Sequence, residues 1–296
     1  VIIVCMTLVS RWFPERYFPP LVGMLEAFAL IGGGMGPLLI PELMELSGWR
    51  GAMECLAMAG IVLAICFAFW VRSWPRGGQV ESQCQIYESE DARKSMGCGC
   101  FLKCCFYGFG LFAMITCFGG LWGMPYLNER FPGQESAVSD VLSLIFAGAA
   151  IGAPLLGWLA SATGRTLLIM LGSGVSTLVF SSLLMFCPCC LGVMGVFCFM
   201  VGLSSGGYML AFSLVKKLSP PRFAGLLLAC ANGSMLLAGP VLQSVVGFIL
   251  DARSTNGIKA LSIVDYQVAF VPLLICQLLA LIAAVLFHRG RLPTGG

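Results

Sequence analysis

Residues 191–214, LGVMGVFCFMVGLSSGGYMLAFSL, contain no charged side chain. About twenty apolar residues suffice for a helix to cross a hydrocarbon core roughly 30 Å thick. The segment does not alternate polar and apolar residues, so it predicts a membrane helix and not a barrel strand. The same pattern predicts further spans at 20–46, 52–74, 101–126, 138–160, 166–187, 223–249 and 266–288, and residues 1–9 read as the end of another helix.

The composition of the whole chain supports a membrane location. Of its 296 residues, 58% are hydrophobic and 10% are charged, and the mean hydropathy is +0.92. Soluble domains carry about 25% charged residues. The sequence therefore excludes a soluble enzyme, a nucleic-acid binder and a disordered chain.

The positive charges predict how the chain is oriented. Of the 17 Lys and Arg residues, 13 fall in alternate gaps between the predicted spans, beginning with the gap that holds Arg11 and Arg16. Lys and Arg are enriched in cytoplasmic loops. We therefore expect these gaps, and the C-terminus, to be cytoplasmic.

A long polar stretch divides the chain. We expect 1–75 to be the end of an N-terminal helix bundle, 76–100 to be a cytoplasmic loop between bundles, and 101–296 to be a six-helix C-terminal bundle. We expect the first bundle to be incomplete, since no initiator Met is present and residues 1–9 read as part of a helix. The sequence thus reads as a fragment.

An internal repeat favours two related bundles. Pro19-Pro20, Gly23 and Gly36-Pro37 recur as Pro220-Pro221, Gly225 and Gly239-Pro240, each set following a basic loop. Transporters of two bundles are built from parallel repeats related by an axis along the membrane normal. Chance recurrence is the alternative, because Gly and Pro are common in membrane helices.

These features resemble the major facilitator superfamily of secondary transporters. Residues 10–14 (SRWFP) with Gly23 resemble the family's junction of helices 4 and 5, and Gly48-Trp49-Arg50 resembles the turn before helix 6. The resemblance implies an all-α polytopic membrane protein with a two-bundle fold, here running from about helix 4 to helix 12.

Two family motifs match in part. Gly23, Gly32, Gly36 and Pro37 resemble the fifth-helix pattern of proton-driven antiporters, with Ile40-Pro41 in place of the closing Gly-Gly. The motif between helices 8 and 9 matches at Gly157, Gly164 and Arg165, but Ser161 occupies its acidic position. Together with Gly239 and Pro240, these residues are expected to serve gating or close helix packing.

Glu26 is the candidate coupling residue. It is the one charged side chain more than five positions inside a complete predicted span. An ionised carboxylate at such depth is costly, so the position favours a proton-coupling site or a site for a substrate amine. The alternative is an entrance position, where the carboxylate reaches water. Glu26 shares a helical stripe with Gly33 and Pro37.

The C-terminal half offers uncharged candidates for substrate binding. Trp122 and Tyr126 lie in a glycine- and proline-rich helix end, where an interfacial aromatic belt is the alternative. The amides of Asn232 and Gln243 either bind substrate or join helices. Ser204, Ser205 and Tyr208, beside Gly206-Gly207, are weaker candidates.

No cofactor or metal site is predicted. The cysteine clusters at 98–105 and 187–190 lack the paired spacing of a metal site, and the chain has a single His, His288. Motifs for ATP-driven pumping or intramembrane hydrolysis are absent from the sequence.

The sequence therefore predicts a non-enzymatic secondary transporter of a small polar solute, working by alternating access and coupled to protons. The alternatives are a drug/proton antiporter and a non-transporting receptor or scaffold with a transporter fold. We expect a multi-pass protein of a bacterial inner membrane or a plasma membrane. Its partners would be the solute, H⁺ and the lipid bilayer, without nucleic acid, and the full-length protein would act as a monomer.

Overall fold

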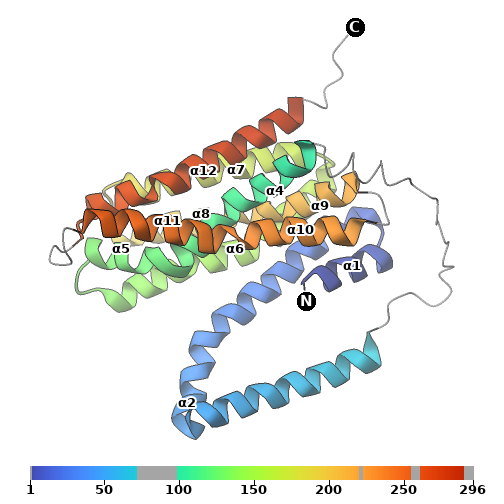
Figure 1. Ribbon diagram of the computed structural model, residues 1–296, viewed down its shortest axis with the longest axis horizontal. Coiled ribbons are helices and arrows are strands. Elements are labelled where there is room, and N and C mark those ends of the chain that lie inside the picture. Colours follow the sequence, from blue (N-terminus) through green and yellow to red (C-terminus); the bar gives the residue numbers. More distant parts are fainter. Residues whose placement is uncertain (1, 72–98, 220–222, 255–260, 290–296) are drawn as a thin grey trace.

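Two prolines and one glycine shape the first long helix, α2 (Phe18–Trp70). Pro19 and Pro20 stand in its first turn, where a missing N–H leaves no hydrogen bond unmade. Gly48 bends the helix sharply, with φ 68° and ψ 172°, a conformation that is essentially restricted to glycine. The two predicted spans 20–46 and 52–74 are thus two helical arms that meet at a non-helical residue, Gly48, under the single label α2 (Figure 1).

The computed structural model describes residues 2–71, 99–219, 223–254 and 261–289, with the backbone alone at 33–42, 288 and 289. Before α2 come α1 (Ile2–Trp12) and the 3₁₀ turn η1 (Glu15–Tyr17). The later helices are α4 (Gly99–Ala113), η2 (Met114–Trp122), α5 (Gly123–Arg130), α6 (Glu135–Thr163), α7 (Thr166–Phe186), α8 (Leu191–Ser205), η3 (Gly206–Tyr208), α9 (Met209–Leu218), α10 (Ala224–Leu236), α11 (Ala238–Arg253) and α12 (Ile263–Arg289). The predicted loop 76–100 lies outside the described residues as far as 98.

The helices from α4 onward form one bundle, in which α12, α7, α8, α11 and α6 run side by side (Figure 1). Within the described ranges, seven helices are long and apolar enough to cross a membrane. No strand occurs in that part of the chain. The predicted class is confirmed: the protein is an all-α polytopic membrane protein.

Glycines bring α6 and α8 into backbone contact. A Cβ on Gly152 would lie 2.0 Å from the Leu203 carbonyl oxygen, and one on Gly202 would lie 2.0 Å from that of Ile145. A Cβ on Gly148 would lie 2.2 Å from the Phe199 carbonyl oxygen, and one on Gly206, at the start of η3, would lie 2.5 Å from the Ala153 nitrogen. Small residues four apart on both helices permit this approach, which is how membrane helices pack closely.

The predicted helix 223–249 is broken into two. α10 ends at Leu236, a turn lies at Leu237, and α11 begins at Ala238. Pro240 has no N–H to donate to the Leu236 carbonyl four residues earlier, so the regular ladder is interrupted here. Asn232 and Gln243, predicted to share one helix, lie on consecutive ones.

The nine residues of η2 have π-helical hydrogen bonding. Regular α-helix resumes at Gly123 and continues to Arg130. Such widened turns are rare and frequently mark functional sites in proteins. The glycines of this glycine- and proline-rich helix end therefore lie in or beside a π segment, and Pro125 follows it in α5.

Candidate functional site

Glu26 lies at the seam between α2 and the bundle. Its side chain is only 7% exposed, and the Tyr208 hydroxyl is a hydrogen-bonding partner of its carboxyl group. Tyr208 ends η3, the short 3₁₀ break between α8 and α9. The contact therefore joins a residue of the first long helix to the interrupted helix of the C-terminal bundle.

Glycines set the position of α2 at this seam. A Cβ on Gly23 would lie 2.4 Å from the Ala153 carbonyl oxygen, and one on Gly157 would lie 2.5 Å from that of Pro19. Gly23 and Gly157, singled out from two different motifs, thus serve one helix crossing between α2 and α6. Glu26 follows Gly23 by one helical turn.

Two polar contacts extend the seam toward the ends of these helices. The Ser161 hydroxyl donates to the backbone carbonyl of Arg16, and the Lys216 ammonium stands 4.0 Å from the centre of the Phe18 ring. Ser161 is the residue at the acidic position of the helix 8–9 motif. It contacts the loop before α2 and not Arg165, which is exposed. In Figure 1 α2 then diverges from the bundle toward its kink.

Hydroxyl groups surround the break at η3. The Tyr107 hydroxyl donates to the Met170 carbonyl at 2.8 Å and lies 2.8 Å from the Ser173 hydroxyl. Thr177 donates to Ser204 at 3.0 Å. The Ser205 hydroxyl is fully buried without a hydrogen-bond partner in the described part of the chain. A buried polar group normally has a partner, so Ser205 marks a place for a water or a polar ligand group.

Trp122 and Gln243 meet at the π segment. The indole N–H of Trp122 donates to the Gln243 backbone carbonyl at 3.1 Å, and the Gln243 side-chain amide donates to the Thr116 carbonyl at 2.9 Å. The π segment and α11 are thereby bonded reciprocally. These donors join helices, which is one of the two roles that the sequence left open for the Gln243 amide.

Tyr126 lies inside the bundle and is not exposed at its surface. Its hydroxyl donates to the Met185 carbonyl at 2.7 Å and accepts from Arg130 at 2.8 Å. Its ring packs against those of Phe118, Tyr266 and Phe270. The residue is fully buried, unlike a member of an interfacial aromatic belt.

The remaining candidates are dispersed. Asn232 is half-buried on α10, and no side-chain hydrogen bond is present for it among the described residues. Gly164 ends α6 with φ 68°, as helix-terminating glycines do. Gly32 borders open space, a Cβ on Gly239 would lie 3.4 Å from Thr116, and Pro240 is exposed. The side chain of Pro37 and the surroundings of Gly36 lie outside the described residues.

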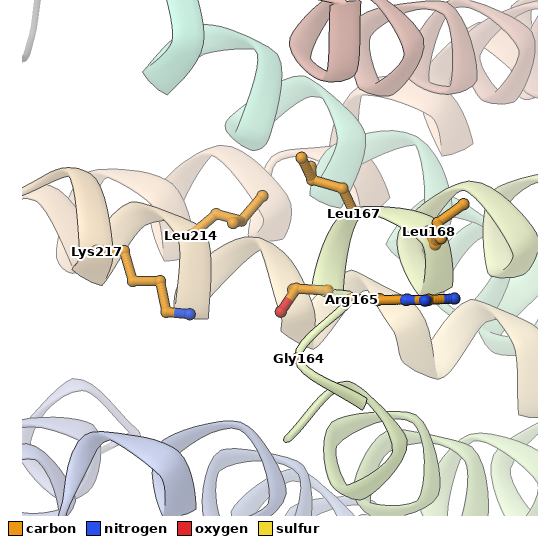
Figure 2. A pocket seen from close by; sticks show the side chains of 7 residues that line it. Gly164, Arg165, Leu167, Leu168, Leu214 and Lys217 are labelled. Carbon is orange, nitrogen blue, oxygen red and sulfur yellow. The ribbon is translucent and has the colours of Figure 1, made fainter. Parts of the chain in front are cut away.

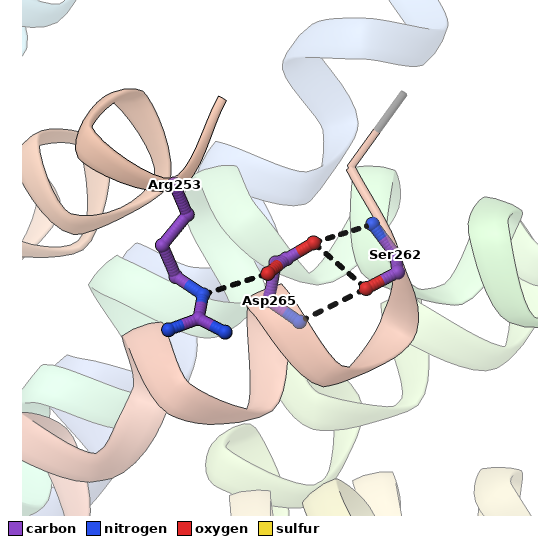
Figure 3. A network of polar contacts seen from close by, with 3 residues as sticks. All are labelled: Arg253, Ser262 and Asp265. Carbon is purple, nitrogen blue, oxygen red and sulfur yellow. Dashed lines mark hydrogen bonds and ion pairs between the residues drawn. The ribbon is translucent and has the colours of Figure 1, made fainter. Parts of the chain in front are cut away.

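A polar network of Arg253, Ser262 and Asp265 lies at the end of the bundle predicted to face outward, and the sequence analysis did not predict it (Figure 3). Arg253, at the end of α11, donates to Asp265 at 2.7 Å. The same carboxylate accepts from the backbone N–H and the hydroxyl of Ser262, at 2.9 and 2.7 Å. Ser262-x-x-Asp265 is a capping box, and this spacing before an apolar run was the signal that could have revealed it.

We expect Asp265→Ala to lower the melting temperature of the detergent-solubilised protein. The change removes the cap of α12 and the ion pair that holds α11 beside it. Asp140→Ala is the matched control, because Asp140 is exposed on α6 and its carboxylate has no hydrogen bond in the described part of the chain. Equal melting temperatures of the two variants would contradict a structural role for the network.

Comparison with known proteins tests the predicted resemblance to the major facilitator superfamily. The chain is 28% identical over 216 residues to a curated protein of Aspergillus fumigatus named MFS-type transporter hasB, an alignment covering 69% of this chain and 47% of that protein. The predicted resemblance to the major facilitator superfamily is confirmed. No family model matches the chain. The chain spans about half the length of this curated relative.

Proposed function

We propose that the protein moves a small polar solute across a membrane by alternating access, with Glu26 carrying the coupled proton. The buried contact between Glu26 and Tyr208 is the observation that supports this function best. A carboxyl group shielded from water holds or releases a proton according to its surroundings. Since its partner lies on another helix at a seam, movement of α2 relative to the bundle would change those surroundings.

The packing of α2 supports the alternating-access part of the proposal. Close contacts at Gly23 and Gly157 join α2 and α6, and Ser161 joins α6 to η1, at the end predicted to be cytoplasmic. Toward the kink, α2 leaves the bundle (Figure 1). This arrangement corresponds to a seam closed on the inner side. The opposite state would require these contacts to separate, and Glu26 lies one turn beyond them.

The similarity to a protein named MFS-type transporter also supports transport. The carried molecule would bind near Glu26 and the hydroxyl-rich break at η3. Buried Ser205, which has no partner in the described residues, would be one of its contacts. A polar solute that pairs hydrogen bonds with these groups suits the site better than an apolar one, because unpaired buried groups are costly.

Solute-dependent proton movement is the measurement that tests this function. The protein that contains this chain would be reconstituted into vesicles with a pH-sensitive dye inside. A panel of sugars, amines, amino acids and carboxylates would then be added outside. At least one class should change the internal pH faster than in protein-free vesicles. Binding of a solute without any flux of solute or protons would instead indicate a receptor or scaffold.

A further inference from the structure

Two hollows on the bundle surface join at Leu168. The first, of about 260 Å³, lies between the start of α7 and the end of α9, and its lining includes Gly164, Arg165 and Lys217 (Figure 2). The second, of about 350 Å³, lies between α6, α7 and α8, and its lining includes Gly172 and Phe180. Leu168 lines both, so the two hollows adjoin at this side chain along α7, and together they are called the groove.

The first hollow is positively charged. Arg165 and Lys217 are exposed, and neither forms an ion pair within the described ranges. Figure 2 shows Lys217 on α9 on one side of the Gly164–Arg165 turn, whereas the Arg165 side chain extends away from Lys217, toward Leu168. α7 starts here without a side-chain cap and without an acidic residue in its first turn. Its first N–H groups and two cations therefore favour an anion.

The second hollow is mainly apolar, with Ser173, Ser176 and Ser204 also in its lining, and lies at membrane depth. It borders α7, a predicted membrane span, and exposed Leu159 and Leu168 form part of its lining. A Cβ on Gly172 would meet nothing within 4 Å. From Leu168 to Phe180 the helix rises about 18 Å at 1.5 Å per residue, and half of a hydrocarbon core is about 15 Å thick. The groove is therefore about as long as one leaflet is deep.

We propose that this groove binds one phospholipid with an anionic head group. Its phosphate would contact Lys217 and the first N–H groups of α7, and the nearby Arg165 would add positive charge to the same hollow. One acyl chain would lie along α7 past Gly172 toward Phe180. The positive charge of the first hollow matches an anionic head group, and the length of the mainly apolar second hollow matches an acyl chain. The basic loops place the charged end in the cytoplasmic leaflet, where anionic lipids are concentrated.

Lipid retention measured by native mass spectrometry tests the head-group end. The delipidated protein would be titrated with phosphatidylserine or with phosphatidylcholine of the same chain length. The wild-type protein should bind one phosphatidylserine in preference to phosphatidylcholine. Lys217→Gln should weaken phosphatidylserine binding about fivefold, the effect of one Lys near an anionic membrane surface. Lys103→Gln, which removes a charge on α4 outside the groove, should leave the binding unchanged.

Variants with a filled groove test the acyl-chain end. Gly172→Leu should lower the retention of both lipids, because its side chain occupies the second hollow. Gly192→Leu is the matched control, since Gly192 also borders open space but lies at the start of α8, outside the groove. Melting temperatures would check that both variants fold. Equal affinity for the two lipids, or unchanged retention in Gly172→Leu, would overturn the proposal. Binding of inorganic phosphate with the same affinity would also overturn it, because the ligand would then be a soluble anion.

Discussion

Glu26→Gln should abolish proton-driven accumulation of the solute and preserve exchange of solute at equal concentrations. The amide keeps the size of the side chain and a hydrogen-bonding group for Tyr208, but it cannot carry a proton. One coupled proton and an imposed gradient of about one pH unit support about a tenfold accumulation, because one pH unit corresponds to about 1.4 kcal/mol. In the variant the solute should reach the same concentration on both sides.

Three further variants make this test specific. Glu26→Asp should retain part of the accumulation with a changed pH profile. Tyr208→Phe removes the partner hydroxyl and should alter the same profile, since the phenol contacts the carboxyl group. Glu129→Gln, at an exposed carboxylate near the end of α5, should behave as the wild-type protein. Normal pH-dependent accumulation in Glu26→Gln would exclude Glu26 from coupling.

Gly152→Leu should prevent the bundle from assembling, and Gly152→Ala should destabilise it strongly. The added Cβ would lie 2.0 Å from a backbone carbonyl oxygen of α8, so the two helices must separate. Overpacking an ordinary core costs about 1–3 kcal/mol. A clash with backbone belongs at the upper end of that range, because a backbone cannot adopt another rotamer.

Thermal unfolding in detergent and the yield of monodisperse protein would measure this effect. Gly172→Ala is the matched control within the same bundle, since its Cβ would meet no atom within 4 Å. It replaces glycine by the best helix former and should raise stability slightly. If Gly152→Ala and Gly172→Ala unfolded at the same temperature, the close crossing of α6 and α8 would be wrong.

The membrane class could be predicted because it depends on local composition. A long uncharged run such as 191–214 fits few structures other than a helix that crosses a membrane. Gly48 lies in the gap between the predicted spans 20–46 and 52–74, and the structure places its non-helical kink there; the sharp angle between the two arms was not predicted. The turn at Leu237 was not anticipated either, although Pro240 was recognised.

Individual residues of the candidate site could be predicted from the sequence, but the contacts between them could not. Glu26 could be identified from the energetic cost of a charge at its depth, and Tyr208 from its position beside two glycines. Their contact depends on how α2 crosses α6, which a single sequence does not encode in any local pattern. Trp122 and Gln243 were likewise found separately. The π segment that brings them together has no periodicity by which it could be predicted.

The π segment acts as a shift in the angular register of its helix. Relative to an uninterrupted α-helix, one additional residue turns everything that follows by about 100° around the axis. Tyr126 and Arg130 reach Met185 and Cys187 only with that offset in place. Because a π turn accommodates that additional residue, a one-residue deletion within Met114–Trp122 should restore regular α-helix and leave both side chains in place. Related chains aligned across this helix should therefore be compared with a one-residue gap permitted at this point.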